Sequence, residues 1–182
     1  MPDKWVFPGG RIHASDFRVP SASELTPDTA AAMARTTTPA RARAIALAAI
    51  RETFEETGLR LARPAPPVRS RGEWRHFLGS GALPDLGALE LVARAITPPA
   101  WTRRFDARFF VADARALLSL DPGTGSGELD ELAWFDWDAA AALDLPQITR
   151  AILTEVALRM GDPGRPIPFH RFARGGHRLD SV

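Results

Sequence analysis

The chain has 182 residues, 45% of them hydrophobic and 25% charged, and a formal net charge of +1. These values are typical of one soluble globular domain and give no indication of a nucleic-acid partner. The absence of cysteine excludes disulfides, thiolate metal sites and thiol nucleophiles. No apolar run approaches the ~18 residues of a membrane span, and the N-terminus lacks the layout of a secretion signal, so we expect a cytoplasmic protein without a membrane partner.

The first part of the chain is predicted to contain one strand and a long loop. Residues 4–10, Lys-Trp-Val-Phe-Pro-Gly-Gly, have the pattern of a short apolar strand that enters a turn. Residues 17–40 contain three prolines and several serines and threonines, with little periodicity. This composition predicts a loop, with one short helical turn around residues 28–35.

A helix is predicted from residue 41 to residue 57. Leu47, Ile50 and Phe54 fall on one stripe at about 100° per residue, while the glutamates of the segment fall roughly opposite. Ile45 lies off this stripe, so we expect the helix to be buried on more than one side. Gly58 is well placed to end it.

The C-terminal part is predicted to combine strands, turns and helices. Residues 61–71 are expected to form a connection, and residues 121–127 a Gly-rich turn. The pattern of strands is found in residues 89–96, 107–112 and 131–135. Helices are predicted at residues 138–143 and 146–160. Residues 161–182 are rich in Gly, Pro and Arg, and we expect a partly ordered tail.

The most informative segment is residues 51–59, Arg-Glu-Thr-Phe-Glu-Glu-Thr-Gly-Leu, which places the carboxylates of Glu52, Glu55 and Glu56 on one helical face. Like charges at this spacing repel, and the helix macrodipole is also negative at this end. A bound divalent cation would offset both costs, since hard cations prefer oxygen ligands such as carboxylates. A solvated helix face interleaved with arginine is the alternative interpretation.

Together, Phe-Pro-Gly-Gly at residues 7–10 and the run at 51–59 resemble the sequence motif of the Nudix hydrolase family. Gly10 corresponds to the first glycine of that motif, and the run at 51–59 to its second half, with Thr53 in place of an apolar residue. Asp16 stands where the family has glutamate. The spacing departs from the family, because 34 residues separate Asp16 from Arg51 where the family has seven.

An insertion at this point of the motif, here residues 17–40, resembles the branch that contains the peroxisomal acyl-CoA diphosphatase and its bacterial relatives. Residues 103–110 and 127–135 support this branch. The resemblance implies an α/β fold with a mixed sheet sandwiched between helices, in a domain that spans residues 1–160.

The N-terminus departs from the family as well. Only seven residues precede the Pro-Gly-Gly turn, where Nudix domains have some tens of residues of strand. We therefore expect the first strands to be missing, from a truncated or wrongly started reading frame. A sheet without them would expose unpaired edges, which favours poor solubility or pairing between chains, with a homodimer as one outcome.

The resemblance implies a catalytic function, the hydrolysis of a diphosphate that joins a nucleoside to another group, with Mg²⁺ or Mn²⁺ as cofactor. The metal ligands would be Glu52, Glu55, Glu56 and the backbone carbonyl of Gly10. Arg51 is expected to orient Glu55. Asp16 is expected to have a structural role, either positioning the helix or capping the turn. The general base stays open between a glutamate of the motif and one of a later loop, for which the candidates are Glu128 and Glu131.

The branch indicates CoA or acyl-CoA as the small-molecule substrate, while nucleoside diphosphate sugars, dinucleoside polyphosphates and NADH stay open. The alternative function is that of a catalytically inactive Nudix module that binds a nucleotide as a sensor or interaction domain. The three glutamates argue against this alternative, because their loss is the usual mark of such modules.

Other side chains are weaker candidates. Arginine binds phosphate in a bidentate way, but in a chain this rich in arginine a surface role is favoured for Arg103, Arg104 and Arg108. Phe109 and Phe110 are favoured as core residues over a platform for base stacking. The histidines have no metal-ligand spacing and are expected at the surface: His13, His76, His170 and His177.

Overall fold

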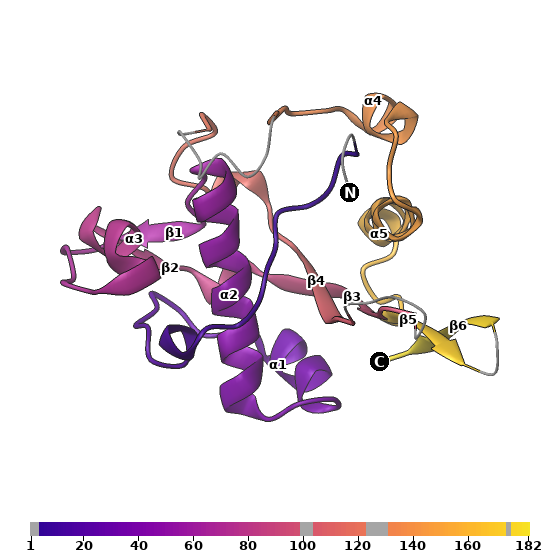
Figure 1. The fold of residues 1–182 in the computed structure, drawn as a ribbon, viewed down its shortest axis with the longest axis horizontal. Coiled ribbons are helices and arrows are strands. Elements are labelled where there is room, and N and C mark those ends of the chain that lie inside the picture. The colour runs from indigo at the N-terminus through magenta and orange to yellow at the C-terminus, as the bar shows by residue number, and fades with distance from the viewer. Residues whose placement is uncertain (1–3, 99–103, 123–130, 174–175) are drawn as a thin grey trace. The chain divides into compact units, whose positions relative to one another are not determined.

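The structure is a computed structural model that describes residues 4–98, 104–122, 131–173 and 176–182 (Figure 1). The chain forms two compact units. The first, here called the sheet unit, consists of Met1–Phe7, Leu91–Val111 and Phe135–Val182. The second, here called the helix unit, consists of Pro8–Glu90 and Ala112–Trp134.

The sheet unit is built on a four-stranded mixed sheet with the strand order β4-β3-β5-β6. Its strands are β3 (Glu90–Ile96, whose first residue belongs to the helix unit), β4 (Asp106–Val111), β5 (Pro168–Ala173) and β6 (Gly176–Ser181). β3 and β5 run parallel, with Arg94 opposite Phe169, while β5 and β6 are antiparallel. The helices of this unit are α4 (Trp137–Ala142) and α5 (Gln147–Gly161). Ile152 of α5 packs against Val92 and Ala93 of β3, which forms the core of the sheet unit.

The helix unit is organised around one long helix, α2 (Pro39–Thr57), which lies beside α1 (Pro27–Ala34) in Figure 1. The other helix of this unit is α3 (Arg75–Gly79), and a two-stranded antiparallel sheet is formed by β1 (Ala62–Pro64) and β2 (Ala82–Pro84). The 3₁₀ helices here are η1 (Ala14–Phe17), η2 (Gly72–Trp74), η3 (Leu86–Ala88) and η4 (Ala114–Ala116).

Local sequence signals explain where α2 begins and ends. The Thr38 side chain accepts a hydrogen bond from the Arg41 N–H, and Pro39 occupies the first helical position, where its missing N–H costs nothing. Gly58 ends the helix in the left-handed conformation, at φ 75°, and its N–H donates to the Phe54 carbonyl at 2.8 Å. Buried residues lie on more than one side of the helix, as the off-stripe Ile45 predicts.

Several predicted elements are confirmed. Strands are present at β3 and β4, and helices at α2, α4 and α5, each within two residues of the predicted bounds. The short helical turn predicted around residues 28–35 is α1. The predicted α/β class with a mixed sheet is confirmed too. Within the described residues, no helix is both long and apolar enough to cross a membrane.

Two predicted strands are wrong. Residues 4–10 pair with no strand among the described residues; the Trp5 N–H donates instead to the Asp144 carbonyl, and Pro8 has no N–H to give to a ladder. Residues 131–135 are also irregular, although two aromatic side chains there are engaged. The Trp134 indole donates to the Leu120 carbonyl at 3.0 Å, and Phe135 packs edge-to-face on Trp5. Apolar residues in these segments therefore make side-chain contacts without backbone pairing.

The segment 161–182, expected to be a partly ordered tail, contributes β5 and β6. β5 completes the sheet beside β3, so the sheet does not end at residue 160. The composition of this segment does not predict its strands, because the apolar residues Phe169, Phe172 and Leu179 are spread between arginines and glycines. The connection predicted at residues 61–71 likewise contains β1.

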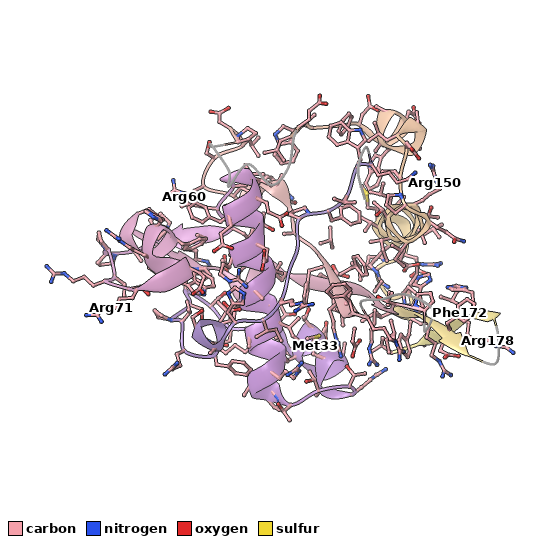
Figure 2. All side chains as sticks on the ribbon, viewed as in Figure 1. Met33, Arg60, Arg71, Arg150, Phe172 and Arg178 are labelled. Carbon is pink, nitrogen blue, oxygen red and sulfur yellow. The ribbon has the colours of Figure 1, made fainter. Side chains whose placement is uncertain are left out.

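Residues 17–40, which were expected to be an insertion, fold into the helix unit. Met33 of α1, labelled in Figure 2, is fully buried, and the Thr29 hydroxyl donates to the Leu89 carbonyl at 3.2 Å. The Ser23 hydroxyl accepts from the Gly87 N–H at 2.7 Å and contacts the Asp85 carboxylate. This segment is therefore anchored both through its loop and through its helix.

Replacing Gly58 with alanine should lower the free energy of unfolding by about 1–2 kcal/mol, because a side chain is disfavoured at positive φ. Urea denaturation followed by circular dichroism would measure this. Gly79→Ala is the matched control, since Gly79 also lies at a helix C-terminus but has open space around its Cα and no positive φ. Equal stabilities for the two variants would contradict the predicted strain at residue 58.

Candidate active site

Two of the three predicted glutamates, Glu52 and Glu55, are held by one buried side chain, that of Arg51. Its guanidinium is only 1% exposed and donates to three carboxylates. Nε and Nη2 bind Asp16 at 3.1 and 3.2 Å, whereas Nη1 binds Glu52 at 2.8 Å and Glu55 at 2.9 Å. Nη2 also donates to the Arg11 carbonyl at 2.7 Å. The predicted contact between Arg51 and Glu55 is present, and it is one part of a larger network.

Asp16 connects this network to the loop that precedes the insertion. Its carboxylate has 0% exposure, and besides Arg51 it binds two further donors. The His13 N–H donates to Oδ2 at 2.7 Å, and the Trp74 indole Nε1–H donates to Oδ1 at 2.8 Å. The two structural roles expected for Asp16 therefore coexist, because it caps the turn at η1 and holds the arginine of α2.

The Gly9–Gly10 turn lies directly against the C-terminal end of α2. The Gly9 N–H donates to Oε2 of Glu56 at 3.3 Å. A Cβ atom at Gly10 would stand 2.2 Å from Oε1 of Glu52, so any larger residue there would require this carboxylate to move. Four predicted site residues, namely Gly10 and the three glutamates, are therefore brought to one end of α2 in spite of the long insertion.

Electrostatics favour the charged form of Arg51. Burial lowers the pKa of Arg51, but hydrogen bonding and charge from Asp16, with a further contribution from Glu52, outweigh it and raise the pKa above its ordinary value. Burial raises the pKa of Glu55; the positive charge of Arg51 opposes this rise and the negative charge of Glu52 adds to it. Glu55 would therefore gain from a second cation close to it.

The chemistry of these groups suits a hard divalent cation. Glu52, Glu55 and Glu56 supply carboxylate oxygens, and the close approach of Glu52 to Gly10 brings backbone oxygen donors of the turn near them. In the part of the chain that the structure describes, no three acidic or histidine side chains already converge on a cation position. The reason is visible in the network, since Glu52 and Glu55 turn toward Arg51.

The candidates for the general base are less defined. Glu128 lies outside the described residues, as do Arg103 and residues 123–127 of the Gly-rich turn that was predicted at 121–127. Glu131 is exposed, in an irregular segment of the helix unit.

The remaining arginine and phenylalanine candidates belong to the sheet unit. Arg104 is exposed and donates to the Thr97 carbonyl. Arg108 is not the surface residue that was expected: its side chain is 6% exposed and pairs with Asp106 at 2.8 Å. Phe109 packs on the core beside Ile152, as predicted for a core residue.

The histidines divide into separate environments. His13 Nδ1 lies 3.3 Å from Glu73, and His170 and His177 face each other across the β5–β6 pair at 3.4 Å between ring nitrogens. Burial, followed by the charge of His177, lowers the pKa of His170. His170 is half-buried, which departs from the expected surface position, while His76 is exposed.

One residue of the network, Trp74, was not predicted from the sequence. It is completely buried and hydrogen-bonded to Asp16, but it lies in a segment where no element was predicted. A lone tryptophan carries no spacing signal. Its contact with Asp16, 58 positions away in the sequence, could not have been found from the sequence alone.

Comparison with known proteins identifies the fold of this chain. No protein-family model and no curated protein matches the sequence. Among solved structures, the chain is similar to the crystal structure of a NUDIX hydrolase from Alicyclobacillus acidocaldarius, with a TM-score of 0.56 and 24% sequence identity. The similarity covers 88% of this chain and 81% of that chain. The chain therefore has an α/β fold of the Nudix type.

Replacing Arg51 with methionine should lower the free energy of unfolding by about 3–5 kcal/mol, because the buried carboxylate of Asp16 would lose its cation. Urea denaturation in the presence of a chelator would measure this without interference from divalent ions. In the control variant Arg115→Met, an exposed ion pair with Asp113 is removed, and stability should hardly change. A similar loss of unfolding free energy in both variants would show that the buried Arg51 stabilises the fold no more than an exposed arginine does.

Proposed function

We propose that this chain is a member of the Nudix family and a divalent-metal-dependent hydrolase of diphosphate bonds. The observation that carries the proposal is the apposition of the Gly9–Gly10 turn and the three glutamates at the end of α2. The Nudix-type fold supports it, since turn and helix are the two halves of the motif that the sequence resembles.

Glu52, Glu55, Glu56 and the backbone carbonyl of Gly10 would hold Mg²⁺ or Mn²⁺. Such an ion neutralises phosphate charge and lowers the pKa of a water molecule. The role of Arg51 is different, because it already binds two of the glutamates and is itself held by Asp16. It would keep their carboxylates gathered at the helix end, where mutual repulsion would otherwise spread them.

The general base would be Glu128 or one of the motif glutamates. A base must lie within hydrogen-bond reach of the water that it deprotonates, either directly or through one further water. Glu128 is the candidate from a later loop.

The substrate class that we propose is a nucleoside diphosphate joined to another group, with CoA or acyl-CoA as the first candidate. CoA hydrolysis would give 3′,5′-ADP and phosphopantetheine. The 17–40 insertion supports this candidate through its position inside the motif. The homodimer and the cytoplasmic location stay predictions.

A specific observation supports the alternative, a nucleotide-binding module without catalysis. In the described arrangement Glu52 and Glu55 already have a cationic partner within the protein, the guanidinium of Arg51. If both carboxylates stay bound to Arg51, nucleotide would bind without being hydrolysed and binding would not depend on Mg²⁺ or Mn²⁺.

Hydrolysis should be detected when the protein is incubated with Mn²⁺ and a panel of CoA, acyl-CoA, ADP-ribose and NADH, with products separated by chromatography and identified by mass. Glu56→Gln should lower turnover by more than about a hundredfold, because a ligand carboxylate is lost. Glu128→Gln in the same assay should lower kcat but leave the Mn²⁺ requirement unchanged if Glu128 is the base.

Glu24→Gln is the matched control, since this exposed glutamate pairs with Arg43 and lies outside the site. Its turnover should equal that of the unaltered protein. Binding of panel compounds without turnover, or background hydrolysis that is equal in the unaltered protein and in Glu56→Gln, would exclude the proposed enzyme.

A further inference from the structure

Trp74 is a buried aromatic residue whose polar atom is aimed at the network of Arg51. It ends η2, has 0% exposure, and its indole Nε1–H donates to Oδ1 of Asp16 at 2.8 Å. The same oxygen accepts from Nε of Arg51 at 3.1 Å. The indole and the guanidinium therefore share one carboxylate oxygen in the interior of the helix unit.

Aromatic packing fixes the indole from its other side. The Trp74 ring meets Phe77 edge-to-face at 5.3 Å, and Phe77 meets Phe54 in the same way at 5.2 Å. Phe54 belongs to α2 and immediately precedes Glu55. Trp74 is thus connected to α2 by two routes, one polar through Asp16 and one apolar through Phe77.

The residue before Trp74 ties the same two segments together at the surface. Glu73 accepts a hydrogen bond from the Ser15 hydroxyl at 3.1 Å and lies 3.3 Å from Nδ1 of His13. These contacts hold η2 against η1, the short helix that carries Asp16. These contacts of Glu73 therefore also constrain where the indole N–H of Trp74 lies relative to Asp16.

The carboxylate of Asp16 needs this support. Aspartate is one methylene shorter than glutamate, so its carboxylate has less reach toward the guanidinium of α2. The indole N–H and the His13 N–H each fix one oxygen of the carboxylate, which leaves both oxygens directed at Arg51. Arg51 in turn sets the places of Glu52 and Glu55.

We propose that Trp74 is a positioning residue of the active site, which acts through Asp16 and Arg51 to gather Glu52 and Glu55 for a divalent cation. This inference rests on the proposed function, because it assigns Trp74 a role toward the cation that those glutamates would bind. Trp74 does not touch the cation or the substrate in this role.

Trp74→Phe removes the indole N–H and keeps an aromatic ring. Mn²⁺ binding, measured by the loss of the electron paramagnetic resonance signal of free Mn²⁺, should weaken about tenfold, as is usual when a partner of a ligand is lost. In the hydrolysis assay, the Mn²⁺ concentration for half-maximal rate should rise by a similar factor, while the KM for substrate at saturating Mn²⁺ stays unchanged.

Two control variants separate positioning from general damage. Met33→Ala removes a buried side chain of α1 and should lower the melting temperature without changing Mn²⁺ affinity. Trp134→Phe removes an indole hydrogen bond of similar length, to the Leu120 carbonyl, and should also leave Mn²⁺ affinity unchanged. An Mn²⁺ affinity for Trp74→Phe equal to that of the unaltered protein, or lowered equally by Met33→Ala, would overturn the inference.

A measurement on the unaltered protein covers the case in which Trp74→Phe does not fold. The indole N–H resonance of Trp74, assigned through the contacts of this residue with Phe77, should shift on addition of Mg²⁺. The indole N–H resonance of Trp134 should not shift. An unchanged Trp74 resonance at saturating Mg²⁺ would overturn the inference while leaving the hydrolase intact. If the unaltered protein neither binds Mn²⁺ nor hydrolyses any compound of the panel, the proposed function and this inference both fail.

Discussion

The burial of the Arg51 charge is the constraint on which the candidate site depends. A guanidinium at 1% exposure is stable only when anionic partners satisfy it, and here Asp16, Glu52 and Glu55 do so. The same arrangement offsets the electrostatic repulsion that glutamates experience at the negative end of a helix. One internal cation is shared between Glu52 and Glu55, while the carboxylate of Glu56 accepts from the Gly9 N–H.

Because Asp16 is one of these partners, the network also joins segments that the insertion separates. The Gly9–Gly10 turn and η1 are held at the end of α2 by contacts to Glu56 and Arg51. The segment between them, residues 17–40, does not disturb this, since α1 is packed into the helix unit through Met33 and Thr29. A long segment that folds onto the helix that it precedes can separate the turn and the glutamates in the sequence without separating them in space.

The sequence was sufficient for features that local patterns determine. The helix with its glutamates, the strands at residues 89–96 and 107–112, and the pairing of Arg51 with Glu55 follow from periodicity or from spacing within one helical turn. Features that depend on distant partners were not predictable. β5 and β6 need β3 beside them, β1 needs β2, and Trp74 acquires its role only because folding places it against Asp16.

The central claim is that the end of α2 and the Gly9–Gly10 turn form a divalent-cation site around a network held by Arg51. The most direct test is X-ray diffraction from crystals grown with Mn²⁺, recorded where manganese scatters anomalously. We predict an anomalous peak coordinated by oxygens of Glu52, Glu55, Glu56 and the Gly10 carbonyl, with Arg51 still bound to Asp16. The absence of such a peak at saturating Mn²⁺, with Glu52 and Glu55 both still bound to Arg51, would contradict the account.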